Sequence, residues 1–327
     1  MDAALSAGRR ERFAASLDAL APAGRLGIAV SGGPDSLALL LLANAARPGG
    51  IAAATVDHGL RAEAAAEAAM VAALCDRLSI PHDTLCVTVT DDPAGPQAAA
   101  RHARYTALTA WAQRNALPFL ATAHHADDQA ETVLMRLARG AGLAGLSGIR
   151  ERRPLADASA TLLIRPLLDW TKAELEAIVA EAGLTPARDP SNSDERYDRT
   201  RARALLAGGW PDATRVAASA HHLAEAEAAL SWTAARLAEE RLSLADDAAT
   251  IDGCDLPREL RRRLLLIAFA ALAPGLEYRG DSVDRLLHAL NQGRVATLAG
   301  FRCDPGPPWR VSRAAARRSG DTPQNRS

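Results

Sequence analysis

Lysine is almost absent from this chain: Lys172 is the single one, and arginine carries nearly all of the positive charge. Lys and Arg together number 38 against 39 Asp and Glu, which gives a formal net charge of −1. Balanced charge excludes a polycationic protein. Any contact with nucleic acid must therefore come from local patches of arginine.

Closely spaced cysteines and long apolar runs are also missing. The 4 cysteines stand far apart without a Cys-x-x-Cys pair, which argues against a zinc site, a redox pair and a disulfide framework. No stretch is apolar for long enough to span a membrane, and the start, MDAALSAGRRERF, lacks the apolar run of a signal peptide. We therefore expect a cytoplasmic protein that makes no membrane contact.

Short apolar runs alternate with helical stretches between Leu26 and about Ala138. The strand-like runs are LGIAV, IAAATV, TLCVTV and PFLATA. The helical stretches cover residues 36–44, 62–78, 97–115 and 127–138. This alternation is typical of an α/β fold, in which a parallel sheet carries helices on both faces.

The later part of the 327-residue chain predicts a second, smaller body. Residues 1–210 form the predicted catalytic domain, and a long helical connector follows over 211–248, with helix expected as far as Ala245. Residues 249–327 carry a short strand, two helices and a hairpin-like segment, which predicts a small α+β domain. Its tail is expected to be disordered from about residue 316.

The turn between the first strand and the first helix reads SGGPDS, Ser31 to Ser36. Glycines let the backbone approach an anion closely, and the amino end of a helix favours negative charge, so the turn is a candidate phosphate cradle. It lacks the Lys of a P-loop and the GxGxxG of a dinucleotide fold. Asp35 stands where phosphates would bind, which implies Mg²⁺ between them. The alternative is a polar turn in which Asp35 or Ser36 caps the helix.

Further polar residues follow later strands, at the edge where open parallel sheets bind ligands. DHGLR follows the second strand and supplies Asp57, His58 and Arg61. HHADDQAET follows the fourth and supplies His124, His125, Asp127, Asp128 and Glu131. Carboxylates and histidines this close together are suited to bind Mg²⁺, to receive a cationic amine and to take its proton. The alternatives are acids that favour the first turn of a helix, and solvated loop residues at His58 and Arg61.

The chain contains, in this order, SGGPDS, DHGLR, RHARYTAL, TAHHADDQAETVLMRLARGAG, IRPLL and DPSNSDERYDRTRARALL. The first segment resembles the PP-loop of the N-type ATP pyrophosphatases. The whole set is similar to the tRNA(Ile)-lysidine synthase family over roughly Leu26 to Leu206. Thr200 departs from the family pattern, in which Asn is expected at that position.

The resemblance implies an adenine nucleotide alpha hydrolase-like fold and a ligase that forms lysidine in an isoleucine tRNA with a CAU anticodon. ATP, Mg²⁺, free lysine and this tRNA would be its ligands, and a homodimer is left open. By position, the resemblance assigns ATP binding to Ser31, Gly32, Gly33, Pro34, Asp35 and Ser36. It assigns catalysis to Asp35, Arg104 and Asp128, lysine binding to Asp128 and Glu131, and metal binding to Asp35. Asp128 is in addition a candidate proton acceptor, metal ligand, or both.

A run of arginines after the DPSN segment suits contact with tRNA phosphates. Its members are Arg196, Arg199, Arg201 and Arg203. Acidic residues interleave with them, so a solvated charged loop is the alternative. Arg101 and Arg104 share a helix face at three-residue spacing, where phosphate contact and a solvent-facing charged helix are equal alternatives. The second domain adds candidate phosphate contacts within residues 258–263 and at Arg310, Arg313, Arg317 and Arg318.

Other functions are compatible with parts of this pattern. A small-molecule amide synthetase such as NAD synthetase would use the same loop without the arginine-rich segment. A tRNA thiolase would need a cysteine at the sheet edge, whereas Cys75 and Cys86 fall within a helix and a strand. A non-catalytic RNA-binding protein would not need Asp35, Asp128 and Glu131 together.

Overall fold

The computed structural model describes residues 5–59, 62–89, 95–157, 159–187, 197–275 and 280–314. The chain divides into two compact units, Met1–Ala224 and Glu225–Ser327, and the division falls within helix α9, Ala213–Arg241. The domain boundaries predicted at residues 210 and 248 remain predictions. Within the described ranges, no helix combines the length and the apolar character needed to cross a membrane.

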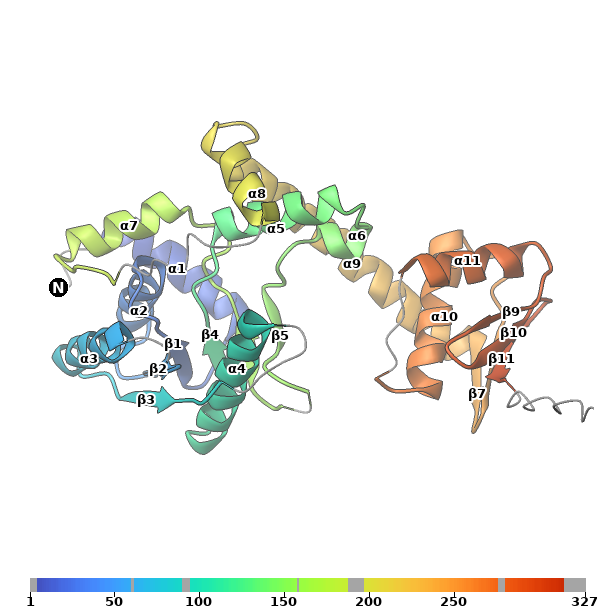
Figure 1. The fold of residues 1–327 in the computed structure, drawn as a ribbon, viewed down its shortest axis with the longest axis horizontal. Helices are drawn as coiled ribbons and strands as arrows, with labels where there is room; N and C mark the ends of the chain where they lie inside the picture. The colour runs from blue at the N-terminus through green and yellow to red at the C-terminus, as the bar shows by residue number, and fades with distance from the viewer. Residues whose placement is uncertain are drawn as a thin grey trace, which may run out of the picture. The chain divides into compact units, whose positions relative to one another are not determined.

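The first unit is built on a six-stranded sheet in the order β3-β2-β1-β4-β6-β5 (Figure 1). Its strands are β1 (Leu26–Ala29), β2 (Ile51–Asp57), β3 (His82–Cys86), β4 (Phe119–Ala121), β5 (Arg152–Pro154) and β6 (Leu162–Ile164). The parallel core is confirmed, because β3 pairs with β2, β2 with β1, β1 with β4 and β4 with β6, all in parallel. The edge strand β5, which we did not predict, pairs antiparallel with β6, because the short loop between them can only reverse the chain.

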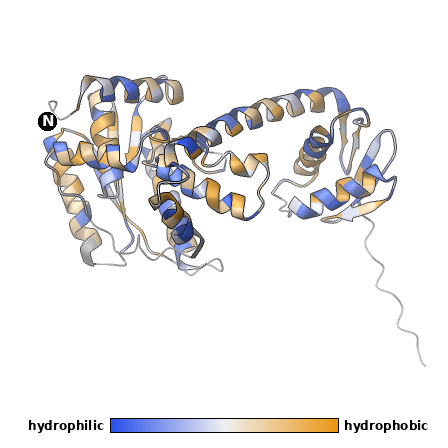
Figure 2. Ribbon diagram, turned by 90° about the horizontal axis from the view of Figure 1, so that it is seen from above, coloured by the Kyte–Doolittle hydropathy of each residue, from blue (hydrophilic) through white to orange (hydrophobic). Residues whose placement is uncertain are grey.

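Helices cover both faces of this sheet, as predicted (Figure 1). The helices of this unit are α1 (Ala7–Leu20), α2 (Pro34–Ala46), α3 (Ala62–Arg77), α4 (Pro96–Arg114), α5 (Ala126–Ala138), α6 (Leu143–Leu146), α7 (Lys172–Glu181) and α8 (Tyr197–Ala207), of which α1, α2, α3 and α7 cover one face and α4 the other. Polar and apolar segments alternate along most helices (Figure 2). Helix α2 differs, since residues 36–43 are all buried in the centre of the unit.

Alternate residues of each strand enter two different cores. Leu26 and Ile28 of β1 pack with α1, α2, α3 and α7, whereas Ala52 and Ala54 of β2 pack with α4. Successive side chains of a strand point to opposite faces of the sheet. Consecutive polar residues that follow a strand are therefore also directed to opposite faces. This sorting positions the site described below.

The second unit contains the end of α9, the helices α10 (Arg258–Leu272) and α11 (Gly280–Asn291), and an antiparallel sheet. Its strands are β7 (Leu242–Ala245), β8 (Ala248–Ile251), β9 (Ala296–Leu298), β10 (Phe301–Asp304) and β11 (Trp309–Arg313), in the order β7-β8-β11-β10-β9. The predicted α+β character is confirmed.

One expectation about the connector was wrong. Helix was expected as far as Ala245, but α9 ends at Arg241 and β7 follows, because residues 246 and 247 form a two-residue turn that pairs β7 with β8. The tail predicted to be disordered from about residue 316 lies outside the described residues.

Candidate active site

The loop Ser31–Ser36 joins β1 to the amino end of α2, where Pro34 is the first helical residue. Gly32 has φ +82°, a conformation that a side chain would strain. The Ser36 hydroxyl accepts a hydrogen bond from the Ser31 N–H at 3.1 Å and donates one to the Gly33 carbonyl at 3.0 Å. Gly33, the N-cap, places no side chain over the helix end. The loop is therefore a preformed ring whose backbone can approach an anion.

His125 connects this loop to the acidic residues of α5. Its Nε2 lies 3.7 Å from Asp35 Oδ2 and 3.5 Å from Asp128 Oδ2, and its Nδ1 lies 3.4 Å from Asp127 Oδ2. Burial opposes the charged imidazolium, but the contacts with Asp127, Asp35 and Asp128 outweigh it and raise the pKa of His125 to about 10. These contacts favour the charged imidazole beside Asp35 and Asp128 when no metal is bound.

Asp127 and Asp128 have different surroundings although they are adjacent. Asp127 accepts a hydrogen bond from the Lys172 N–H at 2.9 Å, which ties α5 to the start of α7, and its contact with His125 lowers its pKa. Burial raises the pKa of Asp128. Asp127 is therefore placed to position His125, and Asp128 is the carboxylate that more readily takes a proton.

Two arginines of α8 occupy the acidic pair that we assigned to lysine. The Glu131 side chain is 9% exposed, and its carboxylate accepts hydrogen bonds from Arg199 Nε at 2.6 Å and from Arg203 Nε at 2.8 Å. Arg199 Nη2 also lies 3.2 Å from Asp128 Oδ1. Both arginines were predicted to bind tRNA. A carboxylate pair that holds guanidinium groups has the charge and the geometry to hold an ammonium group.

The residues after β2 are less directly engaged. Asp57 Oδ1 accepts a hydrogen bond from the Gly59 N–H at 2.9 Å and so shapes the turn. Burial and the charge of Arg104 lower the pKa of His58. The predicted catalytic arginine, Arg104, therefore lies near this turn. Arg61 and Arg196 lie outside the described residues.

His124 faces the opposite side of the sheet from His125, toward α4. Burial lowers the pKa of His124 to about 3, and the charges of Arg165, Arg104 and Arg101 act in the same direction. Arg165 was missed as a site residue, although it directly follows the strand β6 and so stands at the same sheet edge as the predicted residues. That position was the available signal.

Asp35 and Asp128 are the predicted Mg²⁺ ligands. Among the described residues, no three His, Cys, Asp or Glu side chains form a metal-binding group. Mg²⁺ usually needs one or two carboxylates, with phosphates and water completing its shell. Asp35 Oδ1 is buried without a hydrogen-bond partner among these residues, and Asp35 and Asp128 face one imidazole. The two carboxylates fit a metal that arrives with a nucleotide.

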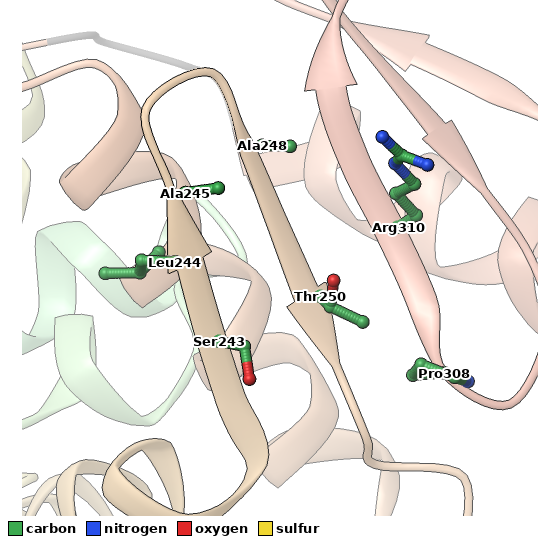
Figure 3. A pocket seen from close by; sticks show the side chains of 7 residues that line it. All are labelled: Ser243, Leu244, Ala245, Ala248, Thr250, Pro308 and Arg310. Carbon is green, nitrogen blue, oxygen red and sulfur yellow. The ribbon is translucent and has the colours of Figure 1, made fainter.

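A pocket of about 390 Å³ lies on the sheet of the second unit. It is lined by Ser243, Leu244, Ala245, Ala248, Thr250, Pro308 and Arg310 (Figure 3). Arg310 is its one ionisable side chain, so the pocket has no carboxylate or imidazole for acid–base chemistry. The chemistry of the first unit, rather than this hollow, identifies the candidate active site.

Comparison with known proteins shows what this chain is similar to. A sequence model of the PP-loop domain matches residues 8–208. The tRNA(Ile)-lysidine synthase of Novosphingobium aromaticivorans is 49% identical over 324 residues, covering 97% of both chains. That of Zymomonas mobilis is 43% identical over 297 residues, covering 90% of both chains.

A solved structure supports the fold alone. The U34-tRNA thiolase NcsA from Methanococcus maripaludis, described with its [4Fe-4S] cluster, aligns with a TM-score of 0.55 and 19% identity. The alignment covers 67% of this chain and 78% of that one.

Proposed function

This chain belongs to the tRNA(Ile)-lysidine synthase family of PP-loop enzymes, and from that premise we propose that it joins free lysine to the wobble cytidine of an isoleucine tRNA with a CAU anticodon. The reaction is a ligation that converts ATP to AMP and pyrophosphate. The observation that carries the proposal is the contact of His125 with both Asp35 of the PP-loop and Asp128 of the acidic pair. The loop suited to phosphate and the acidic pair suited to a cation are therefore neighbours.

In the first half-reaction, the cytidine O2 attacks the α-phosphate of ATP. The bond between the α- and β-phosphates breaks, and pyrophosphate leaves into the Ser31–Ser36 loop, where backbone N–H groups at the start of α2 face it. Asp35 and Asp128 would hold Mg²⁺, which neutralises phosphate charge when bound. Arg104 supplies a fixed positive charge at the same sheet edge.

In the second half-reaction, the lysine amine attacks carbon 2 of the adenylated base and AMP leaves. The amine arrives as an ammonium with a reference pKa of about 10.4, and nearby carboxylates favour that charged form. Glu131 serves to bind the cation. Asp128, which would hold Mg²⁺ only in the first half-reaction and whose pKa is raised by burial when no metal is bound, serves to accept the proton as the new C–N bond forms.

Lysine and the α8 arginines compete for one site under this proposal. Arg199 and Arg203 must leave Glu131 before an ammonium can take their place. Phosphates of a bound tRNA would attract both arginines away from the carboxylates. Lysine binding is then favoured once tRNA is present.

The test is incorporation of radiolabelled lysine into isoleucine tRNA with a CAU anticodon, with a CAU-to-GAU transcript as the control. We expect lysine incorporation and AMP release with the CAU transcript alone. Release of AMP without RNA, in the presence of a small-molecule amine acceptor, would instead favour an amide synthetase. A homodimer remains a prediction, to be measured by light scattering.

A further inference from the structure

Four arginines surround one tyrosine on the α4 side of the sheet, and we call them the arginine cluster. The guanidinium carbons of Arg101, Arg104 and Arg153 lie 4.9, 5.5 and 5.2 Å from the centre of the Tyr105 ring. The charge of Arg165 acts on the same phenol. The cluster joins α4 to β5 and the end of β6, two neighbouring strands that lie far from α4 in sequence.

This positive charge is not neutralised by carboxylates. Within the described part of the chain, no Asp or Glu forms an ion pair with a member of the arginine cluster. Arg165 is 4% exposed, and its buried Nε has no hydrogen-bond partner among these residues. Buried polar groups without partners are costly, which indicates that a ligand completes them.

The arginines of the second unit show the contrast. Arg258 pairs with Asp284 at 2.7 Å, Arg263 with Glu227 at 2.6 Å and Arg313 with Asp247 at 3.0 Å. These arginines have acidic partners within the protein, although the sequence made them candidates for phosphate contact. The uncompensated arginines lie beside His124, at the edge that carries the candidate active site.

The alternation of the strands separates this cluster from the cation site. Leu120 and Leu163 pack with α4. His124 and Arg165 follow them by an even number of positions and so lie on the same side of the sheet, whereas His125 lies on the α2 side. The edge thus carries acidic groups on one face and uncompensated arginines on the other. A reaction between two anionic substrates needs a second anion site of this kind, apart from the PP-loop.

We propose that the arginine cluster binds a phosphodiester of the RNA strand next to the target cytidine. This inference rests on the proposed function and adds the part of the substrate that the cluster holds. The guanidinium group of arginine binds phosphate through two parallel hydrogen bonds. Contacts to the phosphate backbone of a nucleic acid fix its position without reading its sequence. ATP is the less suitable ligand, because its leaving phosphates are served by the loop at α2, on the other face of the sheet.

The test compares Arg101→Gln and Arg153→Gln with Arg114→Gln, an exposed arginine on the same helix as Arg101. Binding of the full-length tRNA transcript is measured between 50 and 200 mM salt, and ATP binding is measured without RNA. We expect each cluster variant to bind tRNA roughly tenfold more weakly. The slope of log affinity against log salt should fall by roughly 0.7–0.9. ATP affinity and the control variant should match the unaltered chain.

A methylphosphonate linkage on either side of the target cytidine removes the phosphate charge directly. In a tRNA assembled from synthetic halves, one of these linkages should weaken binding to the unaltered chain but not to Arg153→Gln. Unchanged tRNA affinity and salt slope in both variants, or an equal loss of ATP affinity, would overturn the proposal. Lysine incorporation by the unaltered chain tests the proposed function separately, because RNA binding does not depend on lysidine formation.

Discussion

Replacing Glu131 by Gln tests whether the acidic pair on α5 binds lysine. The carboxylate is nearly buried and is held by Arg199 at 2.6 Å and by Arg203 at 2.8 Å, so lysine binds by exchange and not into an open site. The amide of Gln keeps the size of the side chain and removes its charge. The measured effect is then the difference between the lost ammonium contact and the lost competition from the two arginines.

The contacts set the expected size. A hydrogen bond between charged groups contributes about 1.5–3 kcal/mol, which is the loss from the ammonium contact. Arg199 and Arg203 are 33% and 40% exposed, so solvent screens their ion pairs. Each such pair is worth on the order of 0.2–1 kcal/mol, which the variant no longer has to break. The net loss is about 1 kcal/mol, or roughly a fivefold rise in the lysine concentration needed.

Chemical quench followed by separate measurement of adenylated tRNA and lysidine distinguishes the two half-reactions. We expect Glu131→Gln to raise the lysine requirement and to leave adenylation largely intact. Arg203→Gln should have the opposite effect on the lysine requirement, lowering it by up to about fivefold, and should weaken tRNA binding. Glu176→Gln, which removes an exposed carboxylate of α7, is the matched control. Loss of adenylation with an unchanged lysine dependence in Glu131→Gln would refute the lysine-site assignment.

Three further substitutions have defined outcomes. Asp35→Asn should slow tRNA-dependent release of AMP and pyrophosphate by roughly a hundredfold or more, since an amide cannot neutralise phosphate charge through a metal. Gly148→Ala should lower the free energy of unfolding in urea by about 2 kcal/mol or more. Gly148 has φ +68°, and a Cβ there would lie 2.7 Å from Gln129 Cδ. His124→Gln should flatten the pH dependence of stability below pH 6.5, because the pKa of His124 is about 3 in the folded chain.

Below pH 6.5 the unfolded chain binds a proton at His124 that the folded chain does not, so stability falls as pH falls toward 3. From pH 7 to 5 this loss is about 2 kcal/mol, and its persistence in His124→Gln would contradict the argument. Gly140→Ala is the control for Gly148→Ala, since Gly140 also has φ +68° and nothing lies within 4 Å of its added Cβ. Equal destabilisation by both would refute the clash, and normal pyrophosphate release by Asp35→Asn would exclude its role.

The local features of this protein were predictable from its sequence. The parallel core follows from the alternation of apolar strands and helices, because the hydrophobic pattern of each element lies within a few consecutive residues. The SGGPDS turn and the acidic residues after His124 are likewise contiguous, so their types and spacing indicate a phosphate site beside a cation site. The edge strand β5 was not predictable in this way, since RRP is short and polar and becomes a strand by pairing with β6.

The tertiary structure alone decided which charges meet. Arg199 follows Glu131 by 68 residues, and the contact between them exists because α8 packs on α5. The arginine cluster draws on α4, β5 and β6, and no spacing within the chain relates Arg101 to Arg153 or Arg165. The two adjacent histidines separate for a simpler reason. Successive residues of an extended chain point to opposite faces of the sheet, so His125 meets the acids and His124 meets the arginines.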